Sequence, residues 1–229
     1  MATFEAQVEA LTGIGGSAAL DGNTTPTDVE LDQFLKDGVI DVTNRCIEKN
    51  PNEATYFMAE SSDQTSNGLN LSGAKIISVV RESNVSNQWE ECRYVSPGSQ
   101  YKVTDSESLD FASIYNPAYT VLENGKISVF PVPGADPNQF KVYYVNNIPY
   151  NKSGSALVHT HEDIGIFPDD KVYLVVIYAA IKCLEAKMAD YTITEEDPEL
   201  VQTITSNLAT LKQQYAEAFG SKQASGRPS

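Results

Sequence analysis

The two histidines of the chain lie close together, in the segment His159-Thr160-His161-Glu162-Asp163. In extended backbone, side chains two residues apart point the same way. His159 and His161 could therefore bind one metal ion, with Glu162 or Asp163 as an oxygen ligand, and a metal-dependent hydrolase is one hypothesis. The alternative is a polar, exposed loop before a helix. We favour the loop, and we predict neither a metal nor a cofactor.

Two groups of carboxylates could also do chemistry. Glu195-Glu196-Asp197 could act in acid–base catalysis or bind calcium, but acids are equally expected before a helix, which they stabilise by about 0.3–1 kcal/mol each. Glu90 and Glu91 beside Trp89 suggest the paired carboxylates of a glycosidase. Neighbouring residues of a strand face opposite sides, so this pair cannot flank one bond. We therefore predict no catalytic residues and no enzymatic activity.

The remaining reactive side chains are the thiols of Cys46, Cys92 and Cys183. They lie on apolar faces or in a strand, without a Cys-x-x-Cys pair, so we expect buried, inert thiols rather than disulfides or a zinc site. The sequence also lacks a phosphate-binding P-loop, a Gly-x-Gly-x-x-Gly fingerprint, a Gly-x-Ser-x-Gly elbow and a His-Glu-x-x-His motif.

Tyrosines are frequent in the middle of the chain. Tyr115, Tyr119, Tyr143, Tyr144 and Tyr150 could line a carbohydrate-binding face, because tyrosine offers an apolar ring with a polar tip. The same residue is ordinary in sandwich strands and in protein interfaces. Carbohydrate or receptor binding is therefore kept as an alternative function.

The chain is strongly acidic. Its 229 residues contain 16 Lys and Arg against 31 Asp and Glu, for a formal net charge of −15 at pH 7. Such a surface repels phosphate, which argues against a protein that grips nucleic acid over most of its surface. The longest apolar run, from Val172 to Ile181, is about half of the roughly 20 residues that a membrane-spanning helix needs. The N-terminus has no basic region followed by an apolar stretch, so we expect no signal peptide.

Residues 3–49 have helical periodicity. A short amphipathic helix is predicted from residue 4, and the glycines from Gly13 onward end it. A second helix starts at Thr27, which forms a capping box with Glu30. Gly38 in the middle of this helix costs about 1 kcal/mol relative to alanine, which suggests a close crossing with another helix.

Residues 53–150 change to short strand-like runs separated by turns. Asn124-Gly125 favours a tight type I′ hairpin, because both residues tolerate positive φ. Ser106–Ser113 could form one helical turn. The predicted strands are Ala54–Glu60, Ala74–Glu82, Glu90–Ser96, Ala118–Leu122, Lys126–Pro131 and Lys141–Asn147. Strands joined by short turns predict antiparallel pairing in a small sandwich or barrel.

Residues 169–220 are helical again. Asp169 can cap a helix that is apolar almost all round, and we expect other elements to enclose it. Asp197-Pro198 starts the last helix. Its apolar residues form a narrow seam for packing on one other helix, within the chain or across a subunit boundary: Val201, Ile204, Leu208, Leu211 and Tyr215.

These patterns together predict an α+β fold. Residues 1–52 and 151–220 form one helical bundle, because the helices at either end have too few partners alone. Residues 53–150 form an inserted antiparallel β-sandwich or barrel. Residues 221–229 lack large apolar side chains, and we expect a flexible C-terminal tail.

Val8–Gly13 and Leu31–Val42 carry the patterns Leu-Thr-Gly and Phe-Leu-x-Asp-Gly-Val-x-Asp-Val, separated by a Thr- and Asn-rich gap. These segments resemble the opening of the α-helical domain in head-to-tail connector (adaptor or neck) proteins of tailed bacteriophages. The helix from Asp169, with Tyr-Ala-Ala at residues 178–180, resembles a later helix of the same family. Three middle segments look like the β-insertion of related neck proteins: Arg93–Pro97, Asn116–Tyr119 and Gly125–Pro131.

The resemblance implies a structural virion protein at the head-to-tail interface, assembled in the host cytoplasm. Proteins of this family form a ring, usually of twelve copies, under the portal, and they extend the DNA channel to the neck or tail. Their C-terminal segment commonly docks into the portal, and here it would offer Lys222 and Arg227.

The expected partners are therefore other copies of the chain, the portal protein, and neck or tail proteins, with no membrane. An acidic wall would let DNA pass without specific binding, because phosphate is repelled. The alternative is a carbohydrate- or receptor-binding virion protein that uses the Tyr- and Asn-rich β-insertion.

Overall fold

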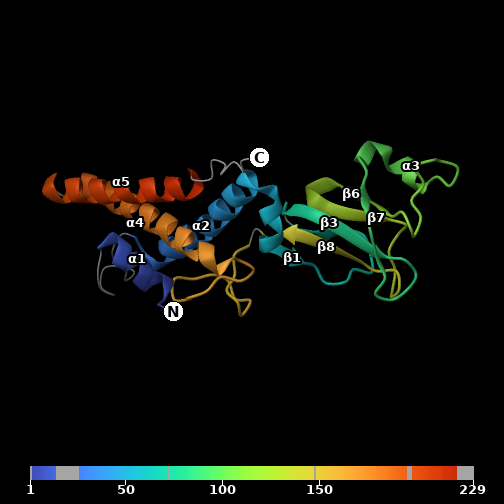
Figure 1. Cartoon of the computed structure of the whole chain (residues 1–229), viewed down its shortest axis with the longest axis horizontal. Helices are drawn as coiled ribbons and strands as arrows, with labels where there is room; N and C mark the ends of the chain where they lie inside the picture. The colour runs from blue at the N-terminus through green and yellow to red at the C-terminus, as the bar shows by residue number, and fades with distance from the viewer. Residues whose placement is uncertain (1, 14–25, 72, 147, 195–197, 221–229) are drawn as a thin grey trace, which may run out of the picture. The chain divides into compact units, whose positions relative to one another are not determined.

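The computed structural model of the chain describes residues 2–13, 26–71, 73–146, 148–194 and 198–220. The chain divides into two compact units, Met1–Phe57 with Ile148–Ser229, and Met58–Asn147. Helices from both ends of the chain pack together in the first, which we call the helical unit (Figure 1). The second, the β unit, contains two four-stranded sheets. The fold is α+β, as predicted, and the described strands form no barrel.

The described part of the helical unit consists of α-helices and short 3₁₀ helices. They are α1 (Phe4–Thr12), α2 (Asp28–Lys49), η1 (Pro51–Phe57), η4 (Asp169–Lys171), α4 (Val172–Thr194) and α5 (Pro198–Gly220). The helix α4 packs against α1, α2 and α5. Most of its first three turns is buried, which confirms the predicted enclosed helix. No helix among the described residues is long and apolar enough to cross a membrane.

The first two helices start at capping threonines. Thr3 Oγ1 accepts a hydrogen bond from the amide of Ala6 at 3.3 Å. The Glu30 amide donates to Thr27 Oγ1 at 3.3 Å, and the Thr27 amide donates to Glu30 Oε2 at 2.7 Å. These two bonds form the predicted capping box. Helix α1 ends at Gly13, whose φ of 66° lies in the left-handed region.

Helices α2 and α4 come very close at Gly38. A Cβ atom at this position would lie 3.1 Å from Tyr178 Cδ1 and 3.3 Å from both Cγ1 and the carbonyl oxygen of Val175. Leu35 and Val39 are buried beside Gly38 in the sequence. The missing side chain therefore makes room for α4, as the glycine in mid-helix suggests.

The start of α4 differs from the prediction that Asp169 caps it. Pro168 precedes the short helix η4, and no side chain caps that helix. Asp169 instead pairs with Lys152, whose Nζ lies 2.9 Å from Asp169 Oδ1. The Asp169 carboxylate therefore forms an exposed ion pair with a lysine of the preceding loop. The local sequence around Asp169 does not indicate this partner.

The described residues of the β unit form two sheets, with strand orders β1-β8-β3-β4 and β2-β7-β6-β5. The strands are β1 (Met58–Glu60), β2 (Leu69–Asn70), β3 (Lys75–Glu82), β4 (Trp89–Glu91), β5 (Arg93–Tyr94), β6 (Ala118–Val121), β7 (Lys126–Phe130) and β8 (Phe140–Val145). The pairs are antiparallel except β5 with β6, which run parallel. Antiparallel pairing was predicted throughout, and this pair departs from it. The long segment 97–117 between these strands, which we call the excursion, allows the parallel crossover.

The core of the β unit lies between the two sheets. Val79, Phe140 and Val142 come from one sheet, and Ile127 and Val129 come from the other; all are buried in one cluster. A second cluster lies on the other face of the β6–β7 sheet and includes residues of the excursion: Val95, Val103, Ala112, Ala118 and Phe130. The excursion, with helices η2 (Pro97–Ser99) and α3 (Gln100–Thr104), therefore forms a third layer on the sandwich.

The hairpin between β6 and β7 forms as predicted, but its turn is not the two-residue type I′. A 3₁₀ turn, η3 (Glu123–Gly125), makes a three-residue loop with Gly125 at a φ of 78°. The Gly125 amide donates to the Leu122 carbonyl at 3.1 Å, and the Leu122 amide donates to the Lys126 carbonyl at 2.7 Å. A glycine in the left-handed region after such a turn is the common way to close a three-residue hairpin loop.

Three further local predictions need correction. In the predicted strand Ala54–Glu60, only the residues from Met58 are a strand. The residues before them belong to the 3₁₀ helix η1, which ends at Phe57. The run Glu90–Ser96 breaks at Cys92 into β4 and β5, which belong to different sheets. Ser106–Ser113 contains turns, whereas the helix α3 lies earlier, after Pro97 has set the first helical residue. The strand pattern also missed the two-residue strand β2.

Candidate assembly surfaces

The two histidines lie in a turn rather than in extended backbone. The His161 amide donates to the Val158 carbonyl at 3.1 Å. His159 Nδ1 lies 2.8 Å from Asp32 Oδ1, and the His159 amide donates to the same oxygen at 2.6 Å. His161 Nδ1 instead accepts the Val158 amide at 3.3 Å. The two rings therefore have different partners, and the extended geometry assumed for a metal site is wrong.

The histidine segment supports the first turn of α1. The carbonyl of His161 accepts the Phe4 amide at 2.8 Å, and the carbonyl of His159 accepts the Glu5 amide at 3.0 Å. Amides in the first turn of a helix have no partner inside the helix, so these bonds complete the start of α1. In the part of the chain that the structure describes, no group of three or more His, Cys, Asp and Glu side chains could hold a metal ion.

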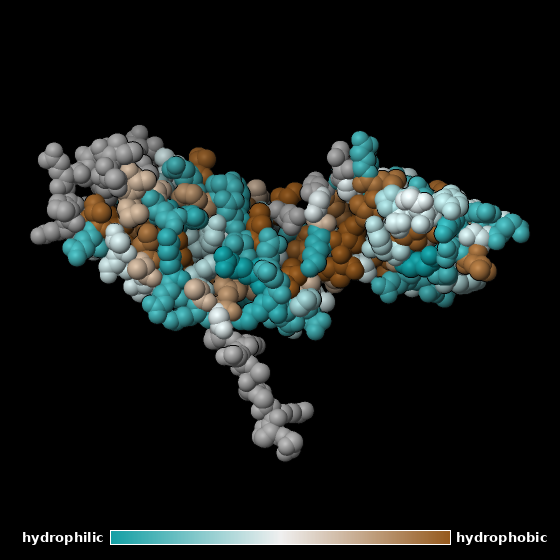
Figure 2. All heavy atoms as spheres, turned by 90° about the horizontal axis from the view of Figure 1, so that it is seen from above, coloured by the Kyte–Doolittle hydropathy of each residue, from teal (hydrophilic) through white to brown (hydrophobic). Residues whose placement is uncertain are grey.

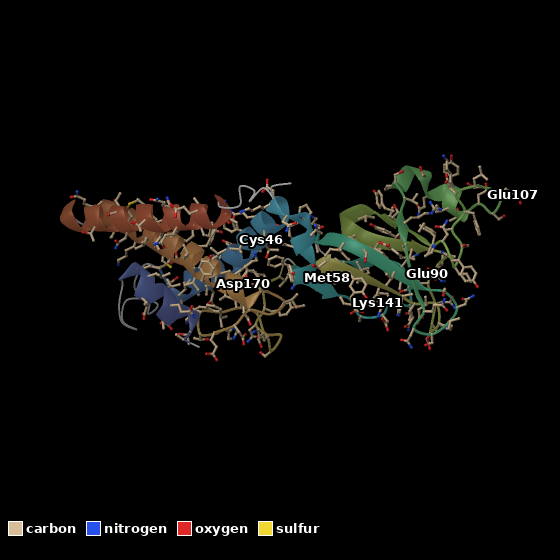
Figure 3. All side chains as sticks on the ribbon, viewed as in Figure 1. Cys46, Met58, Glu90, Glu107, Lys141 and Asp170 are labelled. Carbon is tan, nitrogen blue, oxygen red and sulfur yellow. The ribbon has the colours of Figure 1, made fainter. Side chains whose placement is uncertain are left out.

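The three cysteines are free and buried, as predicted. Burial raises the pKa of Cys46, and it raises the pKa of Cys92 and of Cys183 to about 12. Because the thiolate is the nucleophile, a thiol with such a pKa is unreactive at neutral pH. Figure 3 labels Cys46, which lies on α2 within the helical unit.

Because these thiols are buried, we expect the folded chain to lose stability in alkaline solution. In the folded chain, the pKa values of Cys92 and Cys183 are raised from 9.0 to about 12. Their contribution to stability is therefore complete below about pH 9 and is lost as the pH rises towards 12, by about 1.4 kcal/mol per pH unit for each thiol. Urea unfolding at a series of alkaline pH values measures this slope. Cys183→Ala should make the slope shallower, and an unchanged slope in this variant would contradict the prediction.

The carboxylates singled out from the sequence form no pair on one bond. Glu90 and Glu91 are successive residues of β4, opposite Arg81 and Val80 of β3, so their side chains leave the strand on opposite faces. Glu195-Glu196-Asp197 lies outside the described residues, as do Lys222 and Arg227 of the predicted tail.

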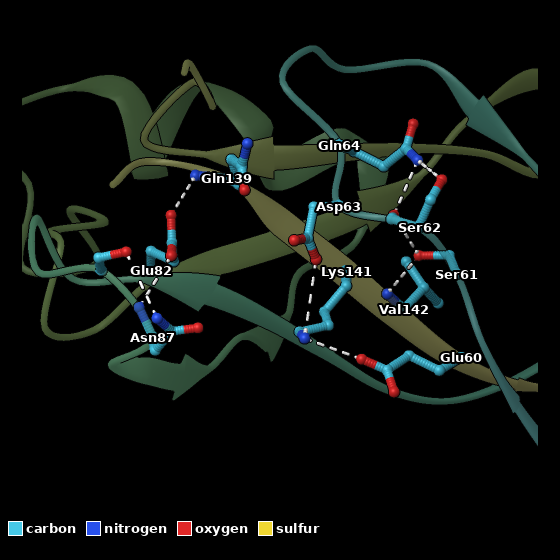
Figure 4. Close-up of polar contacts among 11 residues, drawn as sticks. Glu60, Ser61, Ser62, Asp63, Gln64, Glu82, Asn87, Gln139, Lys141 and Val142 are labelled. Atoms are coloured by element: carbon cyan, nitrogen blue, oxygen red, sulfur yellow. Dashed lines mark hydrogen bonds and ion pairs between the residues drawn. The ribbon is translucent and has the colours of Figure 1, made fainter. Parts of the chain in front are cut away.

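A charged cluster surrounds Lys141 on β8. Its Nζ lies 2.8 Å from Glu60 Oε1 and 3.6 Å from Asp63 Oδ1 (Figure 4). The same Nζ lies 4.1 Å from the centre of the Trp89 ring. The hydrogen bond to Glu60 raises the pKa of Lys141, which therefore stays charged. Lys141 covers one face of the indole, so a sugar ring cannot stack on that face.

The five tyrosines that suggested a carbohydrate face are dispersed. Tyr119 and Tyr144 pack against the core between the sheets. Tyr143, the residue before Tyr144, lies on the opposite face of β8. Tyr115 is exposed on the excursion, and Tyr150 belongs to the helical unit. The described structure therefore does not gather them into one binding face.

The seam predicted on the last helix lies against the rest of the helical unit. Helix α5 contacts α4 and α2. Tyr215 Oη donates to Asp41 Oδ2 at 2.6 Å, and Arg45 Nε donates to the same oxygen at 2.7 Å. Burial and the bond to Asp41 raise the pKa of Tyr215. Val201 is half-buried, and the other seam residues are buried: Ile204, Leu208, Leu211 and Tyr215.

A polar pocket of about 170 Å³ lies beside Cys46 and Asp170, both labelled in Figure 3. Its lysines already have partners. Lys171 Nζ lies 2.9 Å from Glu53 Oε2, and Lys49 Nζ donates to the Phe219 carbonyl at 2.6 Å. Lys49 thus satisfies a carbonyl in the last turn of α5, which is a structural role.

An apolar groove lies between α1 and α4. It has a volume of about 340 Å³ and is lined by Gln7, Ala10, Leu11, Tyr173, Val176 and Ile177. Phe4 and Val8 on α1 are buried, but Leu11 is 40 % exposed and Tyr173 is 54 % exposed. The apolar stripe of α1 is therefore buried at Phe4 and Val8 but exposed at Leu11.

A second apolar surface lies on the excursion of the β unit. Tyr101, Leu109, Phe111 and Tyr115 are all exposed, and Leu109 fully so. Figure 3 labels Glu107, which lies at the outer end of the excursion, away from the strands. In Figure 2, brown surface appears among teal at this end of the β unit. Exposed large apolar side chains that come from one short segment are candidates for protein contacts.

Neither apolar surface was predicted from the sequence. A usable signal was Leu109 and Phe111 within the otherwise polar segment Ser106–Ser113. For the groove there was no such signal, because Leu11 has the spacing of a core residue.

A scan against models of protein families and a search of curated proteins find no match to this chain.

Proposed function

We propose that the protein is a head-to-tail adaptor of a tailed bacteriophage, a non-catalytic ring subunit that docks on the portal and extends the DNA channel to the neck or tail. The observation that carries this proposal is that the potentially reactive side chains of the described structure have structural contacts, while large apolar side chains are exposed. His159 and the cysteines have structural surroundings, whereas apolar side chains are exposed on the α1–α4 groove and on the excursion. Such a chain is suited to contacts with other proteins.

The sequence resemblance supports the same function. Leu31–Val42, which carries the longest pattern shared with connector proteins, lies in α2 and includes Gly38 at the crossing with α4. The pattern thus coincides with the residues that hold the bundle together. The net charge of −15 per chain, repeated around a ring, would repel DNA phosphate and keep the channel free of bound DNA.

Electron microscopy of the purified chain, alone and with purified portal, tests the proposal. We expect a ring near twelvefold symmetry that docks on the portal. A chain that stays monomeric at every concentration and with the portal would refute it. A double variant, Lys222→Glu with Arg227→Glu, should keep the ring and lose portal docking. The control is Lys75→Glu with Lys126→Glu, which changes two exposed lysines of the β unit by the same charge.

The alternative, a carbohydrate- or receptor-binding virion protein, has less support. Lys141 occupies a face of Trp89, and Tyr119 and Tyr144 pack on the core. A glycan array addresses this alternative directly, and reproducible binding to one glycan class would favour it over the adaptor.

A further inference from the structure

Leu109 lies in a part of the excursion whose backbone is held by several hydrogen bonds. The Ser108 amide donates to the Asp105 carbonyl at 3.0 Å, and the Phe111 amide donates to the Ser108 carbonyl at 3.1 Å. The guanidinium of Arg93 on β5 donates to the Asp110 carbonyl. A segment whose backbone is already ordered loses little backbone freedom when it binds. We call residues 105–111 the knob.

The α1–α4 groove has the opposite shape and the same chemistry. Its volume of about 340 Å³ exceeds the roughly 150 Å³ of an apolar cavity that holds benzene, so it has room for a leucine and part of a neighbouring ring. Val176 and Ile177 form a buried floor, and Leu11 and Tyr173 are exposed beside it. Filling the groove would remove this apolar surface from water.

The charge of the chain limits the kinds of contact that could join two copies. Each copy carries a net charge of −15, so copies repel one another, and a contact between them needs an apolar driving force. The knob and the groove supply a protruding and a recessed apolar surface, and every copy has both. Copies of the chain alone therefore provide one knob for every groove.

We propose that the knob of one copy inserts Leu109 into the α1–α4 groove of the next copy. This inference rests on the proposed function, because it names the contact that builds the ring. The two surfaces are different patches of one chain, so the contact is head-to-tail. Contacts of this kind build a ring where the rotation between copies closes, and an open filament where it does not.

Two variants each remove one side of the contact. Leu109→Asp places a charge on the knob and leaves the groove intact. Ala10→Glu places a charge in the groove, on an exposed position of α1, and leaves the knob intact. Each should weaken self-association by about 30-fold or more, the effect of losing one central apolar anchor. Val85→Asp and Val29→Asp, at exposed apolar positions elsewhere, are the matched controls and should assemble like wild type.

Mixing the two variants gives the sharpest result. The Leu109→Asp chain still offers a groove and the Ala10→Glu chain still offers a knob, so a mixture can form one contact and no more. Sedimentation should show 25.0 kDa monomers for each variant alone and a particle of twice that mass for the mixture. Circular dichroism confirms that both variants are folded. Added salt should strengthen assembly of the wild type, because it screens the repulsion.

The other outcomes overturn the insertion in different ways. If wild type and both variants all form rings, the knob and groove do not build the ring, while the proposed function survives. If both variants are monomeric and their mixture stays so, the two surfaces bind something other than each other. If Ala10→Glu alone loses stability, the groove is covered by its own chain. If wild type never assembles, alone or with the portal, both the insertion and the proposed function fail.

Discussion

Replacing Gly38 by leucine should lower the free energy of unfolding by about 3 kcal/mol, because a side chain there has no space. A Cβ atom alone would lie 3.1 Å from Tyr178 Cδ1 and 3.3 Å from the Val175 carbonyl oxygen. The tyrosine ring can turn, but the carbonyl is backbone within α4, so the two helices must separate. The gain in helix propensity of about 1 kcal/mol does not offset that separation. Urea unfolding followed by circular dichroism in the far ultraviolet measures the loss.

The control for this variant lies on the same helix. Asn44→Leu places the same side chain on an exposed position of α2 and should change stability by less than about 0.5 kcal/mol. Equal midpoints for Gly38→Leu and Asn44→Leu would mean that the crossing tolerates a side chain. Close packing of α2 on α4 would then not be the reason for a glycine in mid-helix.

Replacing Glu82 by alanine should lower the stability of the β unit by about 2 kcal/mol, because it removes two hydrogen bonds that each contribute about 1 kcal/mol. Glu82 is only 2 % exposed. Its Oε1 accepts the Asn87 amide at 3.1 Å, and its Oε2 accepts the Gln139 amide at 3.1 Å (Figure 4). Alanine leaves both backbone amides without this partner. The fluorescence of the single tryptophan, Trp89, which pairs with Glu82 across β3 and β4, reports this unfolding.

Two further variants serve as an intermediate case and as a control for Glu82→Ala. Glu82→Gln keeps one carbonyl oxygen and should fall between wild type and Glu82→Ala. Glu91→Ala removes the same charge from an exposed position of β4 and should be close to wild type. If Glu82→Ala and Glu91→Ala unfold at the same urea concentration, the two amide bonds contribute nothing to stability.

The sequence predicts features whose cause lies within a few residues. The capping box of Thr27 and Glu30 needs only side chains three residues apart, and the structure confirms it. The end of α1 at Gly13 follows from one residue that adopts positive φ. The β6–β7 hairpin was found for the same reason. Its turn type was wrong, because Glu123 joins the loop and lengthens it to three residues.

Predictions failed where the partner is distant in the sequence. His159 binds Asp32, a residue 127 positions away, and this contact attaches the histidine segment to α2. Asp169 pairs with Lys152 instead of capping its own helix. The parallel pairing of β5 with β6 depends on how the excursion returns to the sheet. None of these partners leaves a periodic pattern.

The sequence by itself therefore determined the α+β class, the helical ends around a β-rich middle, the capping box of α2 and the acidic charge, because these depend on composition and on contacts between near neighbours. Only the tertiary structure decided which apolar residues remain outside a core. Leu11 has the spacing of a buried helix residue, yet it lies at the groove beside Tyr173, from the far end of the chain. Leu109 stays exposed because Val103 and Ala112 of the same excursion pack on the sheet in its place. Burial is a property of the whole packed chain, and the surfaces proposed for assembly are the apolar residues that packing leaves uncovered.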